Sequence, residues 1–334
     1  ILEHLSWHWI FMVNVPIGII GIFLVTRYVT STTPVGGQQF DIAGAVTLSV
    51  ALLALLLGMT NGQTEGFTSP LTLGLFAVAI ISTVAFVAIE LRHPQPMIEP
   101  SLFRNRLFTV NLVTGLIIFI GIGSSVLIPF YLENVLGYGA QQVGLLLAVM
   151  PVALGITAPI SGTLSDRFGA RPITVAGLAV TAVGYLTLAT LKTDTTAVGF
   201  MLRYLPVGIG LGLFQSPNNS AIMGSVPSDR LGIASSLLAT TRSLGQTVGI
   251  AVLGALWAVL VFRVAGESVP GGATAASVEA QVAGFQITNL IVAILTFGAL
   301  ILAVWTWTRE RRDHKLGVTP VSPSVMATER IPFE

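Results

Sequence analysis

Nine long apolar stretches dominate this sequence and limit what it can fold into. A helix needs roughly 20 apolar residues to cross the ~30 Å hydrocarbon core of a bilayer. Strands of a membrane barrel would instead alternate apolar and polar residues, whereas these stretches are continuous. The sequence therefore predicts an all-α integral membrane protein with nine transmembrane helices. The predicted spans are residues 9–28, 42–60, 71–90, 108–132, 141–164, 172–191, 198–222, 233–261 and 285–308.

Composition excludes several classes of protein. Hydrophobic residues make up 53% of the 334 residues, and charged residues only 9%. The net charge of +1 provides no basic field for a nucleic acid. The absence of cysteine excludes disulfides and thiolate chemistry. The four histidines do not cluster, and no His, Asp or Glu ligands gather inside a span. We therefore expect no metal site and no membrane-embedded enzyme.

The distribution of arginine and lysine predicts the orientation. If the loop after the first span is cytoplasmic, only Lys192 and Arg263 lie outside, while Arg203 and Arg242 fall within spans. Positive residues collect on the cytoplasmic side of membrane proteins, so the C-terminus is predicted to be cytoplasmic. The twelve basic residues predicted inside are Arg27, Arg92, Arg104, Arg106, Arg167, Arg171, Arg230, Arg309, Arg311, Arg312, Lys315 and Arg330.

The densest charge lies in a short turn between the fifth and sixth spans, residues 161–172. Asp166, Arg167 and Arg171 lie close together there, and Gly162 and Gly169 flank them. The turn falls on the predicted cytoplasmic side, so it is poorly placed to touch a substrate at the middle of the membrane. The last six spans form two sets of three, and an odd number inverts the second set relative to the first.

This turn resembles a known family. Residues 162–171, GTLSDRFGAR, resemble the cytoplasmic loop signature of the major facilitator superfamily, in its expected place between the second and third helices of a six-helix half. Residues 7–18, WHWIFMVNVPIG, are similar to the sixth-span signature of the fourteen-span drug:proton antiporter branch, although His8 replaces its usual Arg. Residues 205–212, LPVGIGLG, and 242–245, RSLG, also resemble that branch.

The resemblance implies that the chain, which starts at Ile1, is a C-terminal fragment holding spans six to fourteen. Residues 1–28 would be the last helix of the N-terminal half, and 29–107 a linker with an extra helix pair. Residues 108–308 would be the C-terminal six-helix transport bundle, and 309–334 a cytoplasmic tail. The expected location is the plasma (inner) membrane, and the expected partners are the lipid bilayer, a small-molecule substrate, protons and the missing N-terminal half.

The resemblance also assigns roles to residues. Gly162, Asp166, Arg167, Gly169 and Arg171 would form a conformational-switch loop that contacts neighbouring helix ends in one state only. The substrate cavity would be lined by the first two helices of each three-helix set. Each candidate below has an alternative role, as lipid-facing bulk or in hydrogen bonds between helices. The candidates are Phe119, Phe130, Tyr131, Phe214, Gln215, Asn218, Asn219, Arg242, Gln246 and Trp257.

Proton coupling needs a carboxylate that binds and releases a proton near neutral pH. No acidic residue lies in the middle of a predicted span, and Glu133 is the deepest. Glu133 is therefore the proton-coupling candidate, unless the carrier lies in the missing half. No cofactor is expected, because the proton gradient would supply the energy. Arg242 lies toward the inner end of its span, so it either makes a gating contact or pairs with the inner turns.

The sequence favours a secondary active transporter that exports drugs or hydrophobic or cationic small molecules by alternating access. An exporter dedicated to one endogenous metabolite or antibiotic would differ only in its cavity residues. A non-functional membrane fragment is a further alternative. The glycines of the seventh and eighth spans, among them Gly208, Gly212 and Gly249, favour close helix packing and are compatible with helix sliding.

Overall fold

The structure is a computed structural model that describes residue 8 and residues 12–28, 41–65, 68–93, 100–227, 230–266 and 272–315. Throughout these ranges the regular secondary structure is helical, and no strand is present. Eight of the described helical segments are long and apolar enough to cross a membrane, and one shorter apolar helix precedes them. The predicted all-α membrane fold is therefore confirmed.

The helices follow the predicted spans closely. α2 (Asn14–Tyr28) is the short first helix, and residues 9–11 of the first predicted span lie outside the described residues. Two of the predicted spans are divided into shorter elements. The fourth contains α5, a four-residue 3₁₀ turn, α6 and a π-turn, and the fifth contains α7 and α8. The other elements are α3 (Ile42–Glu65), α4 (Pro70–Glu90), α5 (Arg106–Ile122), α6 (Leu127–Phe130), the π-turn Tyr131–Val135, α7 (Ala140–Leu147), α8 (Val149–Phe168), α9 (Ala170–Leu188), α10 (Ala197–Gly224), α11 (Leu231–Ala265) and α12 (Val278–Lys315).

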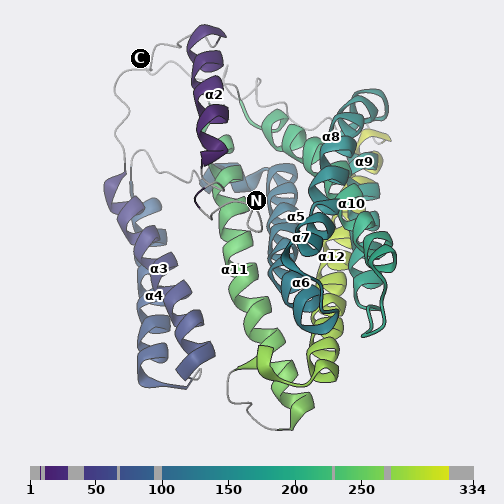
Figure 1. Cartoon of the computed structure of the whole chain (residues 1–334). Coiled ribbons are helices and arrows are strands. Elements are labelled where there is room, and N and C mark those ends of the chain that lie inside the picture. Colours follow the sequence, from purple (N-terminus) through teal and green to yellow (C-terminus); the bar gives the residue numbers. More distant parts are fainter. Residues whose placement is uncertain are drawn as a thin grey trace, which may run out of the picture.

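Helices α5 to α12 form one bundle around a shared apolar core (Figure 1). α10 packs against α8 and α9, while α12 packs against α5, α9 and α11. Glycine makes these approaches possible. A Cβ on Gly177 of α9 would lie 2.5 Å from the backbone nitrogen of Phe214, and one on Gly208 of α10 would lie 2.6 Å from the carbonyl oxygen of Met150. The helices are therefore packed backbone to backbone.

Hydrogen bonds between distant segments at the two ends of the bundle show that the helices alternate in direction as predicted. At one end, the Asn105 side chain accepts hydrogen bonds from the backbone of Leu107 and Phe108 and donates one of 2.8 Å to the carbonyl of Ser225. The start of α5 therefore lies beside the end of α10. At the other end, the hydroxyl of Tyr131 donates to the carbonyl of Lys192, at 2.7 Å. These two ends correspond to the predicted inner and outer loops.

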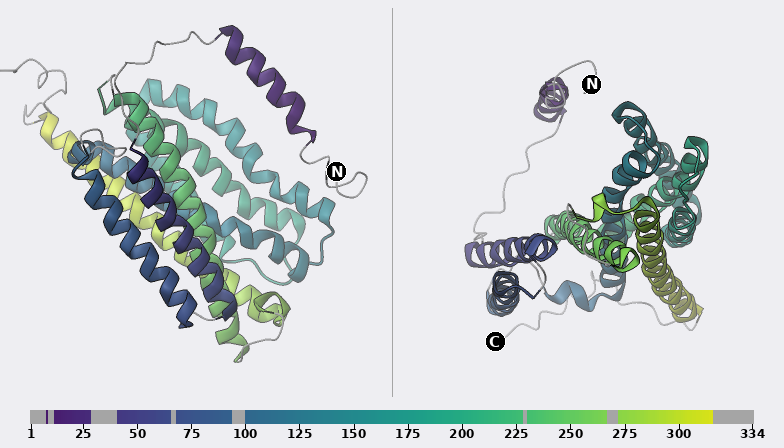
Figure 2. Two further views of the ribbon diagram at one scale, coloured as in Figure 1. Left: turned by 90° about the vertical axis from the view of Figure 1, so that its left-hand side faces the viewer. Right: turned by 60° about the horizontal axis from the view of Figure 1, so that its bottom comes forward.

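Two parts lie outside the bundle. α3 and α4 form an antiparallel pair, and α3 rests against α11 (Figure 2). None of the residues of α2 is buried, and α2 stands apart from the other helices in both views of Figure 2. Residues 29–40, the first part of the predicted linker region 29–107, lie outside the described residues. The carboxylate of Asp41 caps α3 by accepting a 2.7 Å hydrogen bond from the amide of Gly44.

Candidate switch turn and substrate face

The predicted switch loop forms a tight junction between α8 and α9. Asp166 and Arg167 lie in the last turn of α8, and both are exposed. Gly169 joins the two helices with a backbone φ of +88°. Residues with a side chain rarely adopt this φ, so glycine is needed there. The guanidinium of Arg167 lies 5.3 Å from the ring centre of Phe168. Gly162 precedes Asp166 by about one turn of α8, and it is half-buried.

Arg171 gives this turn its ionic contact. Its guanidinium forms an ion pair with the carboxylate of Glu310, which connects the first turn of α9 to the last turns of α12. The side chains are 39% and 21% exposed, so the pair lies at the rim of the bundle. Within the described part of the chain, Asp166 forms no ion pair. The turn therefore contacts a neighbouring helix end through Arg171.

Sequence analysis missed Glu310 because it lies 139 residues from Arg171 in the chain. Its only local signal is that it is an acidic residue among the arginines of residues 309–312.

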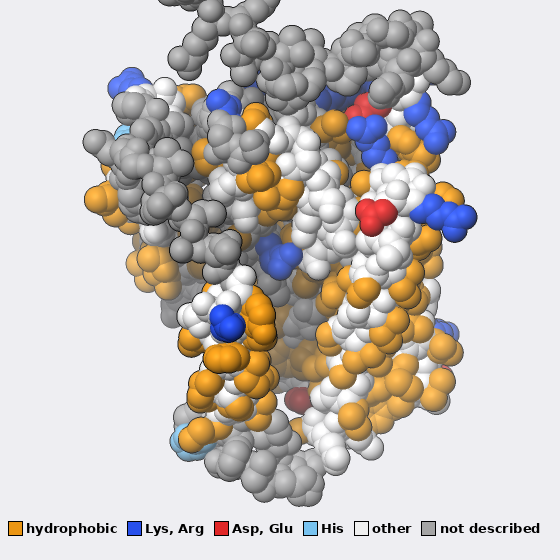
Figure 3. Space-filling view, turned by 90° about the horizontal axis from the view of Figure 1, so that it is seen from above, with side chains coloured by type: hydrophobic (Ala, Val, Ile, Leu, Met, Phe, Trp, Pro, Cys, Tyr) orange, Lys and Arg blue, Asp and Glu red, His pale blue; other side chains and the backbone are white. Residues whose placement is uncertain are grey.

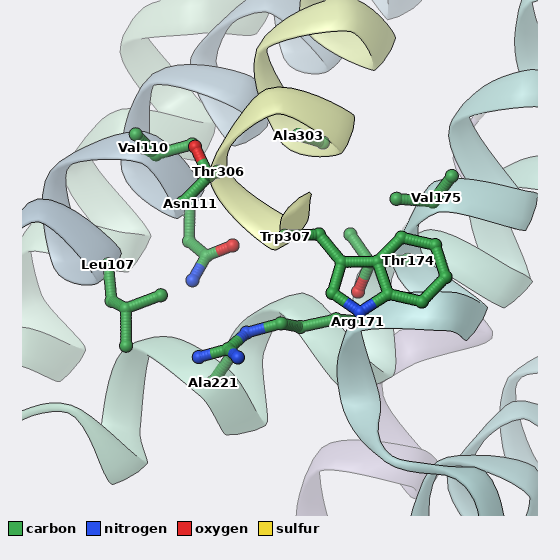
Figure 4. A pocket seen from close by; sticks show the side chains of 10 residues that line it. All are labelled: Leu107, Val110, Asn111, Arg171, Thr174, Val175, Ala221, Ala303, Thr306 and Trp307. Carbon is green, nitrogen blue, oxygen red and sulfur yellow. The ribbon is translucent and has the colours of Figure 1, made fainter. Parts of the chain in front are cut away.

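A small cavity of about 30 Å³ lies beside this ion pair (Figure 4). That volume holds a water molecule or two, and drug-sized ligands need roughly 300–1,000 Å³. The side chains of Arg171 and Asn111 point into the same space in Figure 4. The cavity lies between the ends of α5, α9, α10 and α12. Its lining residues are Leu107, Val110, Asn111, Arg171, Thr174, Val175, Ala221, Ala303, Thr306 and Trp307.

Several substrate-cavity candidates are buried in the bundle core. Phe214 is 1% exposed and Tyr131 is 2% exposed, and both belong to the central apolar cluster. The Tyr131 ring stacks on Phe285 with 5.0 Å between the ring centres. In this structure, these two aromatic residues pack the bundle and do not line an open face.

Asn218 is also buried, and it is not fully satisfied. It is 2% exposed, and its carbonyl oxygen has no hydrogen-bond partner within the described residues. Its amide nitrogen faces Gly115 of α5 and would lie 3.6 Å from a Cβ atom added to that glycine. A buried polar atom without a partner costs free energy, so packing alone does not explain an asparagine here.

Other candidates gather beside α11, and we call this group the α5–α11 face. It consists of Phe119 of α5, Phe130 of α6, and Arg242, Gln246 and Trp257 of α11. Arg242 and Gln246 are exposed and lie one turn apart on α11. The guanidinium of Arg242 lies 5.3 Å from the ring centre of Phe119 on α5. Farther along, the exposed ring of Phe130 stacks on Trp257, which is buried in the central apolar cluster. The ring centres are 6.2 Å apart, and the interplanar angle is 15°. This face therefore combines aromatic rings, an amide and a guanidinium.

The remaining candidates lie elsewhere. Gln215 and Asn219 are half-buried on α10 and lie on the same face of the helix, four residues apart. Glu133 is exposed in the π-turn at the end opposite the switch turn. The indole NH of Trp257 donates to the carbonyl of Gln281 at 3.3 Å, which leaves its ring to stack on Phe130.

Long apolar helices, tight glycine packing and a charged turn at one end define a multi-pass helical membrane protein. Residues 1–250 match the profile described as "Major Facilitator Superfamily". The chain belongs to this family, as its loop signature predicted.

Curated relatives support the same assignment. The chain is 33% identical over 258 residues to "Multidrug transporter protein MdtP" of Bacillus subtilis (strain 168), covering 77% of this chain and 48% of MdtP. It is 35% identical over 263 residues to "Riboflavin transporter RibZ" of Clostridioides difficile (strain 630), covering 77% and 56%. It is 31% identical over 259 residues to "Multidrug resistance protein Stp" of Mycobacterium tuberculosis (strain ATCC 25618 / H37Rv), covering 77% and 48%. The chain spans about half the length of these relatives.

Proposed function

We propose that this chain is part of a proton-coupled exporter of drugs or hydrophobic or cationic small molecules. The observation that carries the proposal is the switch turn, which joins the second and third helices of the α5–α12 bundle and is tied to the last helix through Arg171 and Glu310. Two of the relatives described above are named for multidrug transport or resistance, which supports drugs as the substrate class.

The proposed mechanism is alternating access. Backbone-to-backbone packing at Gly177, Gly208 and Gly249 makes the bundle stiff enough to rock as one body. It would rock against a second half, corresponding to the length of the relatives that this chain does not cover. The Arg171–Glu310 pair would form in one state and break in the other, so its free energy would bias the equilibrium between them.

The proposed substrate surface is the α5–α11 face. Phe130, which is exposed and backed by the buried ring of Trp257, offers an aromatic ring on which planar molecules can stack, and Gln246 offers an amide that can fix their orientation. Cations also bind well to aromatic faces. Arg242 stands at the same face beside Phe119 and would act as a gating contact.

The proton carrier and the orientation are also part of the proposal. Asp166 and Glu310 lie at helix ends near the switch turn, and Glu133 lies at the opposite end. The carrier is either Glu133 or a carboxylate of the second half. The switch turn and the end of α12 face the cytoplasm of a cell bounded by the plasma membrane, as the excess of arginine at that end favours.

A second candidate is export of one endogenous metabolite or antibiotic. It is favoured by the similarity to RibZ, which is named as a riboflavin transporter. The fold and the switch turn would be the same in both cases, and only the α5–α11 face would differ. Competition decides between them, because a multidrug exporter accepts several unrelated dyes and a dedicated exporter accepts one chemical series.

The test uses the full-length transporter expressed in cells loaded with a fluorescent cationic dye. Asp166→Asn should lower efflux at least about tenfold, because the charge of Asp166 is proposed to contact a neighbouring helix end in the other conformational state. The protein should reach the membrane in unchanged amount. Asp194→Asn, in the exposed loop at the opposite end, is the matched control and should leave efflux unchanged. Normal efflux by the Asp166 variant would overturn the role of the switch turn.

A further inference from the structure

Two arginines from different helices converge on one exposed tryptophan. Trp305, near the end of α12, is 45% exposed. The guanidinium carbon of Arg106, the first residue of α5, lies 4.0 Å from its ring centre. The guanidinium carbon of Arg309, one turn further along α12, lies 4.6 Å from the same ring. Both cations are therefore held on a single indole at the rim of the bundle.

Among the residues that the structure describes, no carboxylate neutralises the charges of these two arginines. Within the described residues neither Arg106 nor Arg309 forms an ion pair, and the adjacent Glu310 is bound to Arg171. Their separation is less than the ~10 Å over which 0.1 M salt screens charge. Arg104 and Arg312 add exposed positive charge at the same end. Figure 3, which looks onto this end, shows more basic than acidic side chains. An anion bound between the arginines would relieve their mutual repulsion.

An apolar stripe on α12 leads directly to this pair. Leu290, Ile294, Phe297, Ile301 and Trp305 are all exposed. Their spacing of three or four residues puts them on one face of the helix. From first to last the stripe rises about 22 Å, more than the ~15 Å of hydrocarbon in one leaflet. The stripe is therefore long enough to contact an acyl chain along its whole length, and it ends at a tryptophan, as lipid-facing helices do at the interface.

We propose that Arg106, Trp305 and Arg309 form a binding site for the headgroup of an anionic phospholipid. The phosphate would accept hydrogen bonds from both guanidiniums, which suit this group geometrically, and an acyl chain would lie along the stripe of α12. Anionic lipids carry the negative surface charge of the cytoplasmic leaflet, so the proposal uses the proposed orientation but no transport activity. A lipid bound here links the first turn of α5 to the last turns of α12, close to the Arg171–Glu310 pair.

Tryptophan quenching tests this site directly. Replacing Trp7, Trp9, Trp257 and Trp307 with Phe leaves Trp305 as the single tryptophan among the five of the sequence. The chain is reconstituted into phosphatidylcholine vesicles that contain equal fractions of brominated phosphatidylglycerol or brominated phosphatidylcholine. Each arginine near a membrane surface favours an anionic lipid about fivefold, so we expect the phosphatidylglycerol to quench Trp305 at least about twofold more strongly.

Two variants locate the effect. Arg106→Gln combined with Arg309→Gln should abolish the preference for phosphatidylglycerol, whereas Arg263→Gln, exposed at the end of α11 on the opposite side, should retain it. Equal quenching by the two lipids in the parent, or a preference that survives the double variant, would overturn the site. If the double variant does not reconstitute, the single variants are compared. Arg106→Gln should halve the preference for phosphatidylglycerol, and Arg309→Lys should retain it. A preference that is unchanged in Arg106→Gln, or lost in Arg309→Lys, would overturn the site.

Inorganic phosphate separates a lipid site from an ion site. Millimolar phosphate should leave the lipid preference in place, because it lacks the acyl chain that contacts the stripe. If phosphate alone removes the preference, the arginines bind a free anion and the lipid assignment is wrong. Neither result depends on transport, so the proposed export function and this site stand or fall separately.

Discussion

Arg171, in the first turn of α9, is ion-paired with Glu310, in the last turns of α12. This contact fastens the charged turn after α8 to the final helix of the bundle, across 139 residues of sequence. Because the pair is partly exposed, its expected contribution to stability is small, about 0.2–1 kcal/mol. A contact of that size is weak enough to break in one conformational state and strong enough to shift the populations of two states of similar free energy.

Charge reversal tests the pair. Arg171→Glu should lower the free energy of unfolding by roughly 1 kcal/mol, because two carboxylates then face each other. The unfolding midpoint should fall slightly as a result. Adding Glu310→Arg should recover most of the loss. The midpoints are measured by tryptophan fluorescence in detergent. Arg167→Glu, which has no carboxylate within the described contacts of Arg167, serves as the control and should change little. Strictly additive effects of the two reversals would show that the pair does not couple α9 to α12.

The buried amide of Asn218 allows stability to be separated from function. Asn218→Leu removes a buried carbonyl oxygen without a partner, so the unfolding free energy should stay constant or rise by up to about 1 kcal/mol. If Asn218 is kept for substrate contact, the same variant in the full-length protein loses efflux. Asn134→Leu, on the exposed π-turn, is the control for the added apolar side chain. A clearly destabilised Asn218→Leu would mean that the amide has a structural role.

Hydrophobic length was enough to predict the membrane fold, because each span must satisfy its backbone hydrogen bonds within one helix. The ends were harder to predict. α12 covers Val278–Lys315, whereas the apolar stretch covers only 285–308, because a helix continues through polar residues once it has left the membrane. The π-turn at Tyr131–Val135 gives no hydrophobic signal either.

The candidate site was predicted less well than the fold, because composition does not tell which side of a helix meets a neighbour. Phe214 and Phe130 are both aromatic residues in predicted cavity helices, yet Phe214 is buried in the core and Phe130 is exposed. The contact of Arg171 with Glu310 depends on the fold bringing distant helix ends together. The roles of Asp166 and Gly169 stay predictions, drawn from a local pattern that is short and specific.

Close packing of α5 on α11 should make Gly249 intolerant of even one methyl group. A Cβ on Gly249 would overlap the carbonyl of Ile120, so Gly249→Ala should destabilise the chain by about 1–3 kcal/mol. Gly155→Ala in α8 is the matched control, because no atom lies within 4 Å of its Cβ position. It should be neutral or stabilising by up to about 1 kcal/mol, as alanine is the better helix former. Equal midpoints for the two variants would contradict the packing.

The topology has a simple test, because the sequence contains no cysteine and any introduced thiol is unique. Asp194→Cys, between α9 and α10, and Phe168→Cys, at the end of α8, are at exposed positions on opposite ends of the bundle. In intact cells a membrane-impermeant maleimide should label Asp194→Cys, and it should reach Phe168→Cys only after permeabilisation.

Each other pattern of labelling has a distinct meaning. Reversed labelling would keep the fold but invert the orientation, and it would move the switch turn and the Trp305 site to the outer leaflet. Labelling of both positions in intact cells would mean that α9 does not cross the membrane. Since α9 is the least hydrophobic of the eight long helices, with a mean hydropathy of 1.3, its crossing is the sharpest test of the topology. We expect it to cross, because its buried face packs along α10 for most of its length.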